Sequence, residues 1–115
     1  KEKGIDLVIN LSKAETPEIE ETEKSHIPMD DSKLNEQQDF DRAVERLEKA
    51  LEKGKTVLVH CKEGVSRSIA VTAATIARKE EKSLRQTLNE IEKKRPVANP
   101  HPYLVNQAKK SVRKG

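Results

Sequence analysis

The chain has 115 residues, of which 33% are hydrophobic and 37% are charged, and its formal net charge is +3. This length suits one domain around a lean core, and the near balance of acidic and basic residues gives no indication of nucleic-acid binding. No apolar run approaches the length of a membrane span, and a single cysteine excludes an internal disulfide. We therefore expect one domain, residues 1–115, in a reducing compartment, the cytoplasm.

The N-terminal part predicts two strands joined by an acidic loop. Gly4 is typical of a helix end, and the apolar segment 5–11 that follows it predicts a buried strand. Residues 12–24 contain Pro17 and several glutamates, a composition more typical of a solvent-exposed loop than of a metal site. A second strand is expected over 25–29, ended by Asp30 and Asp31.

The remaining chain predicts helices alternating with one more strand. Asn35 followed by Gln38 indicates a capping box, and the helix that it opens should end at Gly54. Ser83 with Gln86 indicates the start of another helix. Apolar residues at helical spacing mark the faces that should be buried: Phe40, Ala43, Val44, Leu47 and Leu51 in the first helix, 69–77 in the second, Leu84, Leu88 and Ile91 in the third, and Leu104, Val105, Ala108 and Val112 in the last.

Residues 56–68 form the most informative segment. A short β-branched strand, 56–59, leads to Cys61, and a tight loop around Gly64 then leads to a helix beginning near Arg67. Such a loop at a helix N-terminus favours an anion, because free amide groups and the helix dipole both attract negative charge. Arg67 adds a planar fork suited to two phosphate oxygens. The same field should lower the pKa of Cys61 and make it a nucleophile.

The spacing of His60-Cys61, five residues, and Arg67-Ser68 resembles the signature of the cysteine-dependent protein phosphatases, and the segment HCKEGVSRS is similar to their dual-specificity branch. Cys61 alone would more often be a buried, inert cysteine, but the strand, Gly64 and Arg67 in register make that interpretation weak. The resemblance implies an α/β fold with a central, mainly parallel sheet flanked by helices. It also implies that the chain lacks the first strands of the usual domain.

The resemblance further implies roles for single residues. Asp31, in an Ile-x-x-x-Asp pattern from Ile27, matches the general acid, and Asp30 is more simply a turn residue. Ser68 matches the residue that bonds the cysteine sulfur, and His60 is expected to order the loop and tune the thiolate. The expected phosphate-binding residues are Lys62, Glu63, Gly64, Val65, Ser66 and Arg67.

Two details of this pattern are left open. The side chain of Glu63 either faces solvent or orients Arg67. His101 stands where the family commonly has an asparagine, in Arg95-Pro-Val-Ala-Asn-Pro-His101, which puts in doubt the hydrogen bonds that this turn usually gives to the catalytic loop.

The predicted function is metal-independent hydrolysis of phosphomonoesters on proteins, through a phosphocysteine and without a cofactor. Phosphotyrosine is the expected substrate, and phosphoserine and phosphothreonine are further candidates. The alternatives are a phosphoinositide or RNA 5′-phosphatase, disfavoured because Glu63 offsets Lys62, and a phosphate-binding pseudoenzyme, disfavoured because Cys61, Arg67 and Asp31 are all present. We expect a monomer that acts on phosphorylated proteins and binds neither nucleic acid nor membranes.

Overall fold

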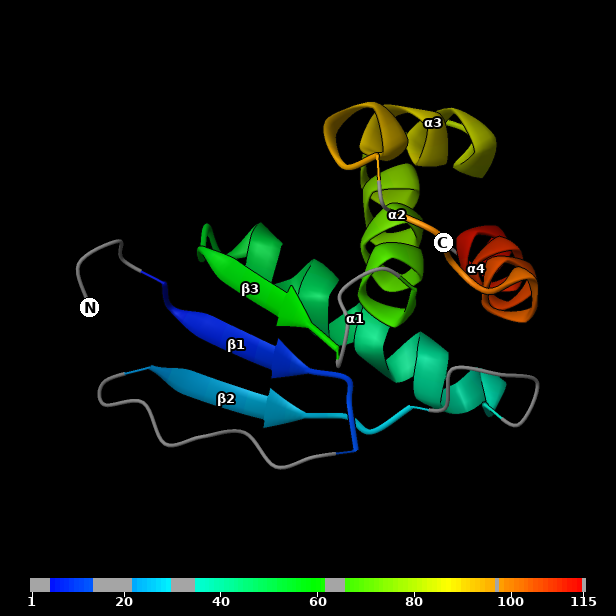
Figure 1. The fold of residues 1–115 in the computed structure, drawn as a ribbon. Helices are drawn as coiled ribbons and strands as arrows, with labels where there is room; N and C mark the ends of the chain where they lie inside the picture. Colours follow the sequence, from blue (N-terminus) through cyan, green and yellow to red (C-terminus); the bar gives the residue numbers. More distant parts are fainter. Residues whose placement is uncertain (1–4, 14–21, 30–34, 62–65, 97, 115) are drawn as a thin grey trace.

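The computed structural model describes residues 5–13, 22–29, 35–61, 66–96 and 98–114. Their elements are β1 (Leu7–Asn10), β2 (Glu23–His26), α1 (Gln37–Glu52), β3 (Val57–His60), α2 (Arg67–Glu80), α3 (Leu84–Lys94) and α4 (Pro102–Lys114). The three strands lie side by side, and the helices gather behind the sheet and beyond the ends of its strands (Figure 1). Within these residues, no helix is both long and apolar enough to cross a lipid bilayer.

The sheet is parallel, with β1 between β2 and β3. Asn10 is in register with His26 on one side and with His60 on the other, so the three strands end level. All four residues of β1 are buried, as expected for the central strand of a parallel sheet. This arrangement confirms the predicted α/β class and brings the carboxyl ends of the strands to one edge, where α/β proteins usually bind their ligands.

Helix α2 is the centre of the helical part and packs against α1, α3 and α4. Its buried face consists largely of alanines, whose small side chains allow neighbouring helices to approach closely. The prediction of a helix buried nearly all round over 69–77 is therefore confirmed. The same core contains Phe40 and Val44 of α1 and Leu104 of α4, each with an exposed fraction of 0%.

Two predicted helix boundaries are confirmed. Gly54 follows the end of α1 with a φ of 76°, the left-handed conformation that glycine adopts without steric cost. Ser83 is the N-cap of α3, and its Oγ accepts a hydrogen bond from the backbone N–H of Gln86 at 3.1 Å. A third boundary had no sequence signal, because the C-cap of α2 is Glu81, a non-glycine residue with a φ of 55°.

The predicted capping box at the start of α1 is wrong. The N-cap of α1 is Glu36, which makes no side-chain cap. Asn35 forms two hydrogen bonds with Gln107 of α4. The Nδ2 atom of Asn35 donates to Oε1 of Gln107 at 2.9 Å, and the backbone carbonyl of Asn35 accepts from Nε2 of Gln107 at 2.7 Å. The helix therefore begins one residue after the position that the local pattern indicated, and Asn35 connects the start of α1 to α4.

The second strand is also displaced from its expected position, since β2 covers 23–26 rather than 25–29. Pairing with β1 already begins at Glu23, whose N–H donates to the carbonyl of Asp6. The extended chain nonetheless continues alongside β1 beyond the strand, because the N–H of Met29 donates to the carbonyl of Leu11 at 3.0 Å.

Candidate active site

The candidate site lies at the edge where the three strands end. Cys61 is the first residue after β3, and Met29 follows β2 by three positions. The N–H of Leu11 donates to the carbonyl of His60, and that of Ile27 donates to the carbonyl of Asn10, so the three chains stay joined beyond the last strand residues. Rigid, paired backbone thus supports both sides of the site.

The candidate nucleophile and its hydroxyl partner are in contact. Cys61 and Ser68 are buried, with exposed fractions of 7% and 6%. Their Sγ and Oγ atoms lie 3.6 Å apart, within hydrogen-bond distance for sulfur. Ser68 is the second residue of α2, so the sulfur lies near the positive end of a helix dipole, which favours a thiolate.

Arg67, the first residue of α2, reaches across the sheet edge. Its Nη1 donates to the carbonyl of Met29 at 2.9 Å, over a sequence separation of 38 residues. Its Nε is buried and has no hydrogen-bond acceptor among the described residues. A buried N–H without a partner is costly, and a phosphate oxygen is an acceptor of the kind that a guanidinium fork binds well.

His60 contributes through its backbone in this structure. It is half-buried at the end of β3, and its carbonyl accepts the hydrogen bond from Leu11. Its ring makes no hydrogen bond with any residue that the structure describes. The contact fixes the direction in which the chain leaves β3 toward Cys61, whereas tuning of the thiolate by the ring stays a prediction.

Ser66 connects the site to the proline-rich turn before α4. It is buried directly before α2, and its Oγ accepts a hydrogen bond from the N–H of His101 at 2.9 Å. The Nδ1 atom of His101 in turn accepts from the N–H of Tyr103 in the first turn of α4, at 3.0 Å. The turn therefore bonds the segment that begins α2 even though histidine stands in place of asparagine.

Several predicted site residues lie outside the described part of the chain. These are Asp31 and the loop residues Lys62, Glu63, Gly64 and Val65. The described residues nevertheless reveal two contacts that the sequence did not. The first joins Arg67 to the backbone carbonyl of Met29, which gives no signal in the side-chain pattern. The second joins Ser66 to His101, a hydrogen bond that the histidine at position 101 had put in doubt.

The acidic loop predicted over 12–24 is described at 12–13 and 22–24, and its last two residues belong to β2. There Glu23 pairs with Lys55 at 2.9 Å and with Arg46 at 3.0 Å. The hydrogen bond from Lys55 and its charge, with a smaller contribution from Arg46, lower the pKa of Glu23. No three His, Cys, Asp or Glu side chains of the described ranges are grouped as a metal site.

Known proteins are similar to this chain in sequence and in architecture. The family model described as dual specificity phosphatase, catalytic domain, matches residues 1–111. The chain belongs to the dual specificity phosphatase family. Dual specificity protein phosphatase 1 of Arabidopsis thaliana is 38% identical over 68 residues, which are 59% of this chain and 34% of that protein. Protein phosphatase Slingshot homolog 3 of Homo sapiens is 44% identical over 61 residues, 53% of this chain and 9% of that protein.

The fold is that of solved dual specificity phosphatases. The crystal structure of human DUSP28 has a TM-score of 0.85 and 27% sequence identity, over 96% of this chain and 79% of that one. The chain spans only about a third of the Arabidopsis relative and less of the Slingshot protein. The match therefore assigns the chain to the family of the catalytic domain, and the activities of those longer proteins are not transferred to it.

Proposed function

We propose that this domain hydrolyses phosphate monoesters on proteins through a phosphocysteine at Cys61. The observation that carries the proposal is the convergence at the start of α2: a buried sulfur lies 3.6 Å from the hydroxyl of Ser68, and the neighbouring guanidinium of Arg67 has a buried Nε with no acceptor among the described residues. A nucleophile beside an unsatisfied, fixed cation suits an incoming phosphate group.

In the first half of the proposed reaction, the thiolate of Cys61 attacks phosphorus and the bond from phosphorus to the ester oxygen breaks. Arg67 and the backbone amides of 62–66 hold the non-bridging oxygens and stabilise the charge that they carry in the transition state. Asp31 gives its proton to the departing oxygen. The products of this half are the dephosphorylated substrate and a phosphocysteine.

In the second half, water attacks the phosphocysteine and gives a proton to the carboxylate of Asp31. The bond from sulfur to phosphorus breaks, and the thiolate returns. The hydroxyl of Ser68 is close enough to donate to the departing sulfur, which stabilises its charge. The cycle conserves atoms and protons with water as the only co-reactant, and we propose no metal ion or cofactor for it.

We propose phosphotyrosine as the preferred substrate, with slower hydrolysis of phosphothreonine and phosphoserine. A deep slot for phosphotyrosine needs aromatic walls, and the chain has one Phe, one Tyr and no Trp. Phe40 is fully buried in the core, and Tyr103 is 38% exposed at the start of α4. With little energy available from ring contacts, discrimination should rest on reach and leaving-group ability, and these seldom exclude a substrate completely.

The purified domain should be assayed, with EDTA present, on an aryl phosphate, on matched phosphotyrosine and phosphothreonine peptides, and on phosphoinositides. We expect turnover of both peptides, with tyrosine faster, and loss of all turnover in Cys61→Ser, whose hydroxyl is barely ionised near neutral pH. Preferential hydrolysis of the phosphoinositides would instead support the lipid alternative. Phosphopeptide binding without turnover in the unaltered protein would support the pseudoenzyme.

A further inference from the structure

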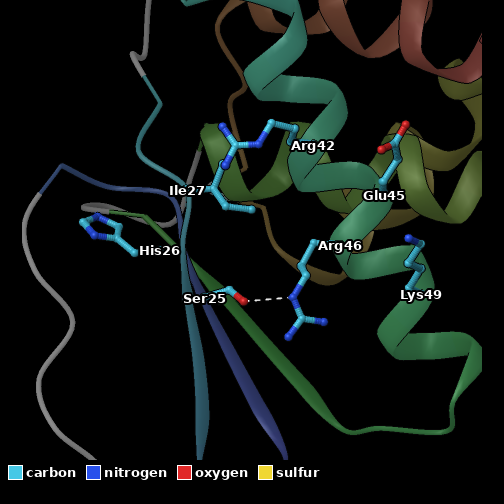
Figure 2. Close-up of a pocket in the computed structure, with 7 residues that line it drawn as sticks. All are labelled: Ser25, His26, Ile27, Arg42, Glu45, Arg46 and Lys49. Carbon is cyan, nitrogen blue, oxygen red and sulfur yellow. Dashed lines mark hydrogen bonds between the residues drawn. The ribbon is translucent and has the colours of Figure 1, made fainter.

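A basic hollow lies between the edge strand β2 and helix α1, and we call it the β2–α1 hollow (Figure 2). It has a volume of about 360 Å³ and is lined by Ser25, His26, Ile27, Arg42, Glu45, Arg46 and Lys49. The lining therefore contains three cationic side chains and one carboxylate. Figure 2 shows Ser25 and Ile27 directed toward α1, with Arg42 beside Ile27.

Arg46, one of the lining residues, is held in orientation by two hydrogen bonds. Its Nε donates to Oγ of Ser25 at 2.9 Å, and its Nη2 donates to Oε2 of Glu23 at 3.0 Å. Its Nη1 has no acceptor among the described residues. A guanidinium held by two bonds with one end still unused is a pre-oriented donor, so binding an anion costs little additional side-chain entropy.

The other two cations keep much of their binding capacity. Arg42 has a side chain that is 64% exposed and contacts Asp39 only through Nη1, at 3.3 Å. Lys49 forms no ion pair with any described residue. In Figure 2 the carboxylate of Glu45 is turned away from Arg46. Because Glu23 pairs with Arg46 and Asp39 contacts Arg42, the hollow offers an anion Lys49 and the unused N–H groups of the two guanidinium groups.

The hollow adjoins the candidate active site. Ile27 lies two residues before Met29, about 7 Å of extended chain, and the carbonyl of Met29 accepts the hydrogen bond from Arg67. A bound peptide in an extended conformation advances roughly 3.3–3.6 Å per residue. The ends of β3 and β2 are separated by β1, roughly 10 Å at the usual strand spacing. With the stretch from Met29 to Ile27, the path from Cys61 to the hollow is roughly 17 Å, which corresponds to about five residues of extended peptide.

We propose that the β2–α1 hollow binds an anionic side chain of the phosphoprotein substrate, a carboxylate or a second phosphate, a few residues from the phosphate that is removed. This inference rests on the proposed function, because it assigns the sequence context that the phosphatase prefers. The shared chemistry is an anion with oxygen acceptors, which the fork of Arg46 and the charges of Arg42 and Lys49 recognise.

The test compares the double variant Arg42→Glu/Lys49→Glu with the control Lys79→Glu/Lys110→Glu, which makes the same change of net charge at exposed sites on α2 and α4. The substrates are an aryl phosphate and three phosphotyrosine peptides with neutral, acidic or additionally phosphorylated flanks. We expect the unaltered domain to prefer the peptides with acidic or phosphorylated flanks. In the double variant, kcat/KM for these peptides should fall about 10-fold through KM, the order expected for reversing two exposed charges. The neutral peptide and the aryl phosphate should be unaffected, and the control should match the unaltered protein.

Equal losses on all four substrates, or no preference for anionic flanks in the unaltered domain, would overturn the inference. The difference in kcat/KM between the peptide with acidic flanks and the peptide with phosphorylated flanks shows which anion the hollow prefers. Failure of the proposed function gives a different result, because the aryl phosphate itself would then resist hydrolysis. In that case fluorescence anisotropy of the same peptides on Cys61→Ser, with and without the hollow variants, decides the inference: equal affinity for neutral and anionic flanks rejects it.

Discussion

Replacement of Arg67 by lysine separates the binding of phosphate from the stability of the fold. Nη1 of Arg67 donates a hydrogen bond to the carbonyl of Met29 at 2.9 Å, and the buried Nε of Arg67 has no acceptor among the described residues. Lysine keeps the charge but not the planar fork, so at least one charge-assisted bond to the phosphate is lost. Such a bond is worth about 1.5–3 kcal/mol, which corresponds to a loss of about 10- to 150-fold in kcat/KM.

The cost of this change to stability should be small. The variant loses the charge-assisted bond to Met29, about 1.5–3 kcal/mol, but it also removes the buried, unsatisfied Nε, which costs about 1–3 kcal/mol, and these effects oppose one another. We therefore expect the free energy of unfolding, measured by urea titration, to change by less than about 1 kcal/mol. The assay of activity is kcat/KM on an aryl phosphate and on a phosphotyrosine peptide.

Arg78 provides a matched control on the same helix. It pairs with Glu48 at 3.3 Å and also has a buried Nε without an acceptor among the described residues. Arg78→Lys should therefore affect stability much as Arg67→Lys does and leave kcat/KM unchanged. The reasoning is refuted if Arg67→Lys turns over normally, or if both variants lose the same activity.

Three further predictions concern Ser68, Asp31 and Ser66. Ser68→Ala should slow breakdown of the phosphoenzyme, giving a burst of alcohol release before a slower steady state in stopped-flow assays; a linear time course at unchanged kcat would assign Ser68 to packing alone. Asp31→Ala should lose about 10²-fold on substrates with poor leaving groups and much less on an activated aryl phosphate, and if Asp30→Ala is the more damaging, the acid is misassigned by one residue. Ser66→Ala should destabilise the domain by about 1–2 kcal/mol in urea, because the N–H of His101 loses its acceptor, and an unchanged midpoint would mean that water replaces the bond.

The sequence predicted those features that depend on local pattern. The β-branched run before Cys61, the apolar stretch after Ser68 and the cap at Ser83 each act over a few residues, so periodicity and capping chemistry indicated their elements. The candidate site benefits from the same locality, because the nucleophile, the arginine and the serine lie within one strand–loop–helix segment.

The features that the sequence missed depend on partners far along the chain. Asn35 is a residue type typical of a helix cap, yet α1 is capped by Glu36, and the Nδ2 atom of Asn35 bonds Gln107, 72 residues away. The start of β2 is set by pairing with β1, not by its own side chains, which are only partly buried. The acceptor for Arg67 at Met29 is a backbone carbonyl, which any residue type would supply. No pattern of side chains could have indicated it.

The central claim is that Cys61 carries the phosphoryl group during turnover. The most direct measurement is to mix the domain with a radiolabelled phosphotyrosine peptide, stop the reaction with acid within the first turnover, and locate the label by peptide mapping. The proposed mechanism predicts a labelled peptide that contains Cys61 and no label in Cys61→Ser. Label on another residue, or hydrolysis by Cys61→Ser at the rate of the unaltered domain, would contradict it.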